Sequence, residues 1–293
     1  MKLFFVKIFL LFSFVAFSQK KYEFSGVIKL NGDDKTLITY TLNFSLKNNV
    51  VEGFSITDIG GPHETKNTIT GTYNDKTKAF KFSESQILYT KSMFERTEFC
   101  YVFFEKSLKI DDDLKKIEGN FTGKYKDGKT CINGTILLVN QKKIEKTIAK
   151  FNTKIQKSTK VEEKTKEQLN LHTIIDSLKV NYLLKGQNLS VFTSSKVVTV
   201  EIWDNKKEDG DAINLYQNNK LILKEYTVLN KKKTIEIELN GESTVLKIEA
   251  TKEGEIKPNT TMIRIIDGTN NYELMSNLKK WETASITFVN QAN

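Results

Sequence analysis

Alternation of apolar and polar side chains with a period of two runs through residues 22–139 and limits the possible folds more than any other feature. The clearest run has an apolar side chain at every second position, namely Ile38, Tyr40, Leu42, Phe44 and Leu46. This period is typical of an antiparallel strand with one buried and one solvated face. Similar runs, separated by turn signals, occur at residues 22–30, 50–57, 67–73, 78–82, 87–90, 99–105, 116–125 and 131–139. The first half is therefore predicted to be an antiparallel meander, either a small barrel or a sandwich.

Glycine recurs inside these runs in an apolar-x-Gly-x-apolar pattern, centred on Gly26, Gly71, Gly119 and Gly134. Glycine within a strand often marks a bend or a close approach of two backbones, which a curled sheet requires. A closed barrel of this size is either a ligand-holding calyx, in the style of lipocalin-like or avidin-like barrels, or is filled by its own side chains. We favour the filled barrel, because the sequence shows no convergent set of polar residues.

Residues 141–173 differ in composition from the strands before them and are predicted to be a basic, partly helical connector. Nine lysines and four glutamates lie between residues 141 and 170. A narrow apolar stripe at helical spacing is formed by Ile144, Ile148, Phe151 and Ile155. Such a segment is either a contact for an anionic polymer or a membrane surface, or a solvated linker whose first turns pack on the barrel as a helix. We favour the linker.

Short strand patterns return in the last part of the chain, at residues 178–184, 189–193, 197–203, 212–216, 221–223, 234–239, 243–250, 262–266, 272–274 and 284–289. About ten strands in this space predict a β-sandwich of the immunoglobulin-like or jelly-roll type. The chain is thus expected to be all-β, with a barrel or meander at 20–140, the connector at 141–173 and the sandwich at 174–293.

The first nineteen residues have the pattern of a cleaved export signal. Lys2 and Lys7 precede or flank an apolar run at residues 8–17, and Ala16-Phe17-Ser18 supplies a small-x-small cleavage motif. The run is shorter than the roughly 20 residues that a membrane span needs. The cleavage point has no cysteine to carry a lipid anchor, so a lipoprotein is not expected. The chain is therefore expected in the periplasm, outside the cell or at its surface, with no transmembrane segment in its mature form.

Export changes the interpretation of the two cysteines, because pairs outside the cytoplasm usually oxidise. Cys100 and Cys131 both lie in strand-like runs and are predicted to form a disulfide between neighbouring strands. A redox-active pair is the alternative, but the C-x-x-C spacing typical of such pairs is missing.

Several segments of the second half resemble a C-terminal β domain found in exported, largely uncharacterised envelope proteins of the Bacteroidota type. The resemblance covers roughly residues 175–290 and lies in VEIWDN at 200–205, EDGDAI at 208–213, NNK at 218–220, IKPNTT at 256–261 and IID at 265–267. Lys257 and Thr261 depart from the Pro and Ala of that pattern. The resemblance implies an envelope location and a β fold, and no particular activity.

The only cluster of candidate ligands is an acidic loop formed by Asp204, Glu208, Asp209 and Asp211. Its oxygens could serve Ca²⁺, which takes six to eight of them, although the spacing is not that of an EF-hand and Lys206 and Lys207 would repel a cation. The alternative is a hairpin whose carboxylates cap backbone N–H groups. We favour the hairpin and keep calcium as the one cofactor prediction.

Few residues remain for catalysis. His63 and His172 have no partner at metal or triad spacing, and no nucleophile-elbow or zinc motif occurs. The acidic run at residues 111–113 is expected to be a solvated turn. Much of the formal net charge of +9 lies in the connector, where aromatic residues are scarce, so nucleic-acid binding is not expected.

We therefore expect an exported, non-enzymatic binding or structural module of the cell envelope. Its partner would be another envelope protein, a glycan or a small apolar ligand. The alternative is a small-ligand carrier that uses the barrel interior. A hydrolase built on carboxylates alone stays open as a third hypothesis, because such pairs converge in space rather than in sequence.

Overall fold

The computed structural model describes residues 20–32, 36–95, 97–158, 162, 180–205 and 207–291. The expected export signal, His172, Lys206 and the later part of the connector lie outside these residues. Within the described part of the chain, no helix is long and apolar enough to cross a membrane.

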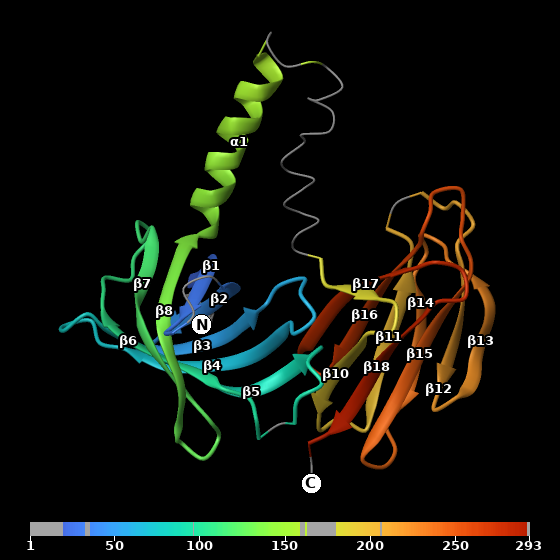
Figure 1. The fold of residues 1–293 in the computed structure, drawn as a ribbon, viewed down its shortest axis with the longest axis horizontal. Helices are drawn as coiled ribbons and strands as arrows, with labels where there is room; N and C mark the ends of the chain where they lie inside the picture. The colour runs from blue at the N-terminus through green and yellow to red at the C-terminus, as the bar shows by residue number, and fades with distance from the viewer. Residues whose placement is uncertain are drawn as a thin grey trace, which may run out of the picture.

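Eight antiparallel strands form a closed up-and-down barrel at the N-terminal side of the molecule (Figure 1). Each strand pairs with its neighbours in sequence, and β8 returns to β1 with Ile136 opposite Ile28. The predicted meander is thus a barrel rather than a sandwich. The strands are β1 (Lys20–Leu30), β2 (Leu37–Lys47), β3 (Val50–Thr57), β4 (Thr65–Tyr73), β5 (Ala79–Thr90), β6 (Tyr101–Ser107), β7 (Lys116–Lys124) and β8 (Thr130–Asn140).

Strand β5 corrects one sequence prediction. Residues 78–82 and 87–90 were expected to be separate strands because the residues between them are polar, but β5 runs without a break from Ala79 to Thr90. The physical reason is that Glu84 faces the barrel interior and is buried there among hydrogen-bond donors. A polar side chain at an inward position interrupts the alternation of apolar and polar residues from which strands are predicted.

Aromatic rings in contact with one another occupy the barrel interior. The ring centroids of Tyr22 and Phe44 are 5.0 Å apart, those of Phe44 and Phe80 5.3 Å, and those of Phe82 and Phe104 5.3 Å. These centroid distances are typical of packed aromatic pairs. This packing favours the filled barrel over the hollow one.

Three of the four glycines in the predicted pattern, Gly26, Gly71 and Gly134, lie where two backbones approach closely, whereas a Cβ atom on Gly119 would meet only side-chain atoms, at 3.2 Å or more. A Cβ atom on Gly71 would lie 2.0 Å from the carbonyl oxygen of Lys81, and one on Gly53 would lie 2.0 Å from that of Asn43. No real Cβ tolerates so short a contact, so glycine lets adjacent strands approach where the sheet coils.

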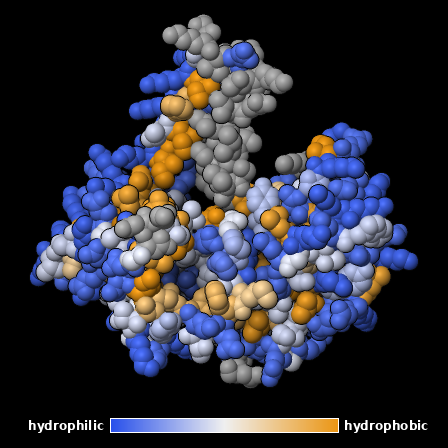
Figure 2. Space-filling view, in the orientation of Figure 1, coloured by the Kyte–Doolittle hydropathy of each residue, from blue (hydrophilic) through white to orange (hydrophobic). Residues whose placement is uncertain are grey.

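Helix α1 (Gln141–Lys157) follows β8 directly and stands out from the barrel (Figure 1). The side chain of Asn140 caps it by accepting a hydrogen bond from the backbone N–H of Lys142. The first turn touches the barrel, where Ser25 Oγ donates to Gln141 Oε1 at 3.1 Å. The helix is longer than the first turns expected from the sequence, and its apolar stripe runs along it as an orange band in Figure 2.

Ten strands form the C-terminal sandwich, as the sequence predicted: β9 (Tyr182–Leu184), β10 (Asn188–Thr193), β11 (Val197–Trp203), β12 (Ala212–Gln217), β13 (Lys220–Thr227), β14 (Lys233–Glu238), β15 (Ser243–Lys252), β16 (Asn259–Asp267), β17 (Asn270–Leu278) and β18 (Thr283–Asn290). One layer has the order β13-β12-β15-β18-β10 and the other β14-β11-β16-β17-β9. The pairs β10–β18 and β9–β17 are parallel. Residues of both layers, including Val200, Leu246 and Ile286, pack in one apolar core.

The barrel and the sandwich share a sheet. Strand β5 leaves the barrel at its C-terminal end, where Tyr89 and Thr90 pair with Val191 and Ser190 of β10. The Tyr89 side chain enters the sandwich core and meets the Tyr272 ring edge-on at 5.7 Å. The connector is therefore not the only link between the two parts, since hydrogen bonds and a shared core also join them.

Candidate functional site

A groove of about 690 Å³ lies where the barrel meets the sandwich, and we call it the junction groove. Its volume is within the range of about 300–1,000 Å³ typical of small-molecule sites, which often lie between domains. The barrel side of its lining includes Phe54, Lys66, Thr68 and Gln86. The sandwich side includes Ser194, Ser195, Asp267, Asn270, Asn271 and Gln291. Strands β3, β4 and β5 thus face the end of β10 and the β16–β17 hairpin.

Lys66 is the cation of the junction groove. Its Nζ lies 4.0 Å from the centre of the Phe54 ring and 5.5 Å from that of Tyr272, a cation–π arrangement. Burial lowers the pKa of Lys66, because desolvation disfavours the charged ammonium, and nearby Glu64 only partly opposes this effect. Among the described residues, the ammonium is held by rings and makes no ion pair with a carboxylate.

Asp267 supplies negative charge on the other wall, at the start of the turn between β16 and β17. It is buried and accepts a hydrogen bond of 2.5 Å from Ser195 Oγ. Asn270 and Asn271 follow in the same hairpin with exposed side chains, and these amides bond to no other described side chain. The groove therefore combines a cation, an anion that already has a donor, and neutral amides.

Gln291 lies where β5 and β10 separate and forms hydrogen bonds with both strands. Its backbone N–H donates to the carbonyl of Thr193 at 2.8 Å, and its Nε2 donates to the carbonyl of Ile87 at 3.3 Å. Its Oε1 accepts from Gln86 Nε2. Gln291 therefore uses a backbone carbonyl of each strand, that of Thr193 in β10 through its own backbone N–H and that of Ile87 in β5 through its side chain.

A buried ion pair fixes the barrel end next to the groove. Glu64 Oε1 accepts from the Tyr89 hydroxyl at 2.8 Å, and Glu64 Oε2 accepts from the Gly60 backbone N–H at 2.7 Å. Lys91 Nζ lies 3.5 Å from the same Oε2, and both charged side chains are almost completely buried. Burial lowers the pKa of Lys91 and raises that of Tyr89. We call Glu64, Tyr89 and Lys91 the junction clamp; all of its charges have internal partners.

A second polar cluster lies inside the barrel. Glu84 accepts hydrogen bonds from the Tyr40 hydroxyl at 2.9 Å, from Ser55 Oγ at 2.5 Å and from the Val102 backbone N–H at 2.8 Å. Burial raises the pKa of Glu84 despite these donors. The neighbouring Asn67 has a buried Oδ1 with no partner among the described residues. These groups are sealed in the interior and do not face the junction groove.

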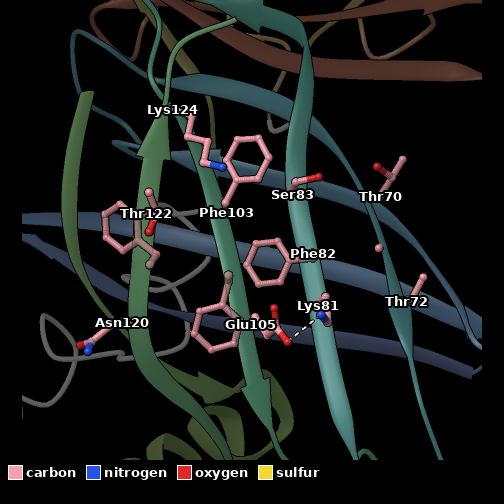
Figure 3. Close-up of a pocket in the computed structure, with 13 residues that line it drawn as sticks. Thr70, Thr72, Lys81, Phe82, Ser83, Phe103, Glu105, Asn120, Thr122 and Lys124 are labelled. Atoms are coloured by element: carbon pink, nitrogen blue, oxygen red, sulfur yellow. Dashed lines mark ion pairs between the residues drawn. The ribbon is translucent and has the colours of Figure 1, made fainter. Parts of the chain in front are cut away.

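A second groove of about 450 Å³ crosses the outer face of β4 to β7, with Phe103 at its centre (Figure 3). Its charged side chains already have partners: Lys81 Nζ pairs with Glu105 Oε1 at 2.6 Å, and Lys124 Nζ lies 4.9 Å from the centre of the Phe103 ring. Both members of the ion pair are more than half exposed. Water therefore solvates these charges, whereas the ammonium of Lys66 is half-buried, and the junction groove is the stronger candidate.

The acidic loop predicted from the sequence uses its carboxylates to cap backbone groups. Asp211 accepts from the N–H groups of Gly254 at 2.7 Å and Thr260 at 2.8 Å. Asp209 accepts from the N–H of Ile256 at 2.7 Å, and Glu208 from that of Asn230 at 2.6 Å. The capping of backbone N–H groups is thus as expected from the sequence, but the hairpin is not, because the flanking strands β11 and β12 belong to different layers of the sandwich. Burial raises the pKa of Asp211.

The fourth member of the predicted calcium set, Asp204, is buried beside this loop. Across the part of the chain that the structure describes, no three His, Cys, Asp or Glu side chains are grouped as a metal site requires. Calcium binding by Asp204, Glu208, Asp209 and Asp211 stays a prediction. The hydrogen bonds of the loop account for three of these carboxylates without a metal ion.

The predicted bond between Cys100 and Cys131 is confirmed, with their Cα atoms 6.1 Å apart, but it does not join neighbouring strands as expected, because β7 lies between β6 and β8. The bond lies beside Gly123 of β7, where a Cβ atom would come within 2.5 Å of the Cys100 sulfur. It therefore connects the segment before β6 to β8 across β7.

His63 lies on the barrel surface next to the junction clamp. Its Nδ1 is 3.3 Å from Ser92 Oγ, and its ring lies 5.8 Å from the Phe94 ring. The acidic run at residues 111–113 forms surface ion pairs, with Asp111 to Lys109 at 2.8 Å and Asp112 to Lys20 at 3.0 Å. Neither feature contributes to the junction groove.

Sequence reasoning missed the junction groove because its lining comes from segments as far apart in the chain as Phe54 and Gln291. No local signal in the sequence marks Lys66, because the burial of its neighbours Glu64 and Thr65 is visible only in the structure. Nothing in the sequence places Phe54 and the β16–β17 hairpin beside it. Comparison with protein-family models, curated proteins and solved structures finds no match for this chain. The resemblance to Bacteroidota-type envelope proteins therefore stays an expectation.

Proposed function

We propose that this chain is an exported, non-enzymatic binding module of the cell envelope whose ligand occupies the junction groove. The observation that carries the proposal is the half-buried Lys66 ammonium, which faces a groove fixed by two structural units and makes no ion pair with any described carboxylate. The disulfide supports export, because such bonds persist mainly outside the reducing cytoplasm.

Rigidity of the groove favours binding. The continuous sheet from β10 into β5, the Gln291 bridge and the junction clamp all hold the two walls in place. A preorganised site loses less conformational entropy when a ligand binds than a site that must first close. The ligand is expected to be an envelope component, either a glycan or the exposed part of another envelope protein.

The alternative expected from the sequence, a small-ligand carrier, would need space inside the barrel. The contacts between Phe44, Phe80 and their neighbours support a filled interior instead. We therefore place the ligand outside the barrel, in the junction groove.

The proposal is tested by filling the groove. Thr68 is a half-buried residue of β4 that lines it, and Thr68→Trp would occupy the space in front of Lys66. Thr122→Trp is the matched control, because Thr122 lies in the second groove on the outer face of the barrel. Both variants and the native chain are labelled and applied to arrays of glycans and envelope-protein peptides, after circular dichroism has shown that they fold.

We expect the native chain and Thr122→Trp to bind the same array members, and Thr68→Trp to lose at least nine-tenths of that signal. Unchanged binding by Thr68→Trp would place the ligand elsewhere and refute the role of the groove. Absence of any array member bound by the native chain would count against the binding function itself.

A further inference from the structure

We infer that the ligand of the junction groove is an acidic oligosaccharide whose carboxylate binds Lys66 Nζ. This inference rests on the proposed function, because it identifies the ligand class of the same groove. It follows from the state of Lys66, from the partners already used by the groove backbone, and from the neutral side chains around it.

Lys66 needs a negative partner that the described chain does not supply. A half-buried ammonium loses hydration, and aromatic faces restore only part of that loss. Glu64 is the carboxylate that acts on it electrostatically. Both oxygens of Glu64, however, already accept from Tyr89, Gly60 and Lys91. A carboxylate brought by the ligand would complete the environment of the Lys66 ammonium with a charge-assisted hydrogen bond.

The floor of the groove favours a sugar chain over a peptide. Peptides commonly bind to sheet proteins by adding a strand to free backbone N–H and C=O groups. Where β5 and β10 separate, Gln291 already donates to the carbonyls of Ile87 and Thr193. The groove is lined by the side-chain hydroxyls and amides of Thr68, Ser194, Asn270 and Asn271. Such groups donate to and accept from sugar hydroxyls.

Asp267 limits how much negative charge the groove can hold. It is buried on the opposite wall, with one hydrogen bond from Ser195. A carboxylate close to Asp267 would be repelled, so an acidic group is accepted only on the Lys66 side. We therefore expect one uronate ring at Lys66, with its neighbouring sugars held by the hydroxyl and amide groups.

A trisaccharide with a single galacturonate at one end and the methyl ester of that trisaccharide are suitable probes, because esterification removes the one carboxylate charge and adds only a methyl group. Binding to each is measured by isothermal titration calorimetry at low ionic strength, where charge interactions are least screened. The variants are Lys66→Gln, which removes the charge, and Lys66→Arg, which keeps it. Lys124→Gln is the matched control, since Lys124 also lies over a phenyl ring but in the second groove.

We expect the native chain to bind the trisaccharide with the free galacturonate at least tenfold more tightly than its methyl ester. Lys66→Gln should lower the affinity for the acid to that for the ester, Lys66→Arg should retain most of it, and Lys124→Gln should bind as the native chain does. Equal affinity for acid and ester, native-like binding by Lys66→Gln, or no binding of either probe would overturn the inference.

Failure of the inference is distinguishable from failure of the proposed function. If Thr68→Trp abolishes binding to an array ligand and Lys66→Gln leaves it unchanged, the groove is the site and the carboxylate contact is wrong. If Thr68→Trp also binds normally, the groove is not the site at all. Thermal melting of each variant confirms that any loss of binding does not come from unfolding.

Discussion

Glu84 is a carboxyl group that the barrel keeps inside its apolar interior. It is 3% exposed and accepts hydrogen bonds from Tyr40, Ser55 and Val102. Desolvation is the largest influence on it and raises its pKa above the usual 4.5, although each donor acts in the opposite direction. These hydrogen bonds, together with one from the Asn67 side chain, therefore reduce the cost of burying the carboxylate without making it as stable as it is in water.

The sign of the resulting pH dependence follows from proton binding. Between pH 4.5 and its raised pKa, Glu84 holds its proton more tightly in the folded chain than in the unfolded chain. The contribution of Glu84 to stability is therefore greatest below pH 4.5 and is lost as the pH rises through the raised pKa. The slope cannot exceed about 1.4 kcal/mol per pH unit for one group.

Glu84→Gln removes this titration, and we expect the stability of that variant to fall less between pH 4 and pH 8 than that of the native chain. Urea unfolding at each pH gives the two profiles. Glu105→Gln is the control, because Glu105 lies on the adjacent strand β6 but is exposed, and its profile should parallel the native one. Parallel profiles for Glu84→Gln and the native chain would contradict the assignment.

Strands are the scale at which the sequence is most informative. The period-two pattern predicts most barrel strands because each has one apolar and one polar face, and it predicts ten strands in the sandwich. It fails at residues 83–86, where Glu84 places a polar side chain on the inner face of β5. The pattern also cannot show that the end of β5 pairs with β10, one hundred residues later, because alternation says which face is buried and not which strand is adjacent.

The candidate site was less predictable than the strands. Asp204, Glu208, Asp209 and Asp211 attracted attention because acidic residues close in sequence resemble a ligand set, yet three of them cap backbone N–H groups. Lys66 is one lysine among many in the sequence. What distinguishes it is burial against Phe54 and Tyr272, which only tertiary packing creates.

The disulfide stabilises the part of the barrel that it joins. Cys100 and Cys131 are 31 positions apart and connect the segment before β6 to β8. Closing a loop of this length stabilises a chain by about 3 to 4 kcal/mol in the loop-entropy description. We expect Cys100→Ala/Cys131→Ala to lose about that much free energy of unfolding in urea, and reduction of the native chain to cause a similar loss. A change below about 1 kcal/mol would show that the β7–β8 pairing alone holds this part of the barrel.

At the scale of the whole molecule, the barrel and the sandwich are joined by a thirteen-stranded sheet as well as by the connector. Contacts of several kinds cross the junction: the β5–β10 backbone pairs, the Gln291 bridge, the Tyr89–Tyr272 ring contact and the cation–π contact of Lys66 with Tyr272. Tyr89 belongs to both sides, since its hydroxyl donates to Glu64 of the barrel while its ring is part of the sandwich core. Unfolding of either part therefore removes contacts that stabilise the other.

This shared structure predicts that the two parts unfold together. Trp203 and Trp281 are the only tryptophans of the chain and both belong to the sandwich, so their fluorescence reports on that part alone. Phe103→Trp, at a partly exposed position of β6, adds a probe for the barrel. In urea, we expect the sandwich signal of the native chain and the barrel signal of Phe103→Trp to change at the same midpoint.

Tyr89→Ala should separate the two transitions, because it removes the ring from the sandwich core and leaves Glu64 without one of its donors. Replacing a buried aromatic side chain by alanine costs about 3 to 5 kcal/mol, and most of this loss falls at the junction. The measurement compares both fluorescence signals in Tyr89→Ala with and without Phe103→Trp. Tyr226→Ala is the control, since Tyr226 packs on the sandwich core away from the junction; it should lower stability without separating the midpoints. Two transitions in the native chain, or one shared transition in Tyr89→Ala, would show that the coupling does not pass through β5.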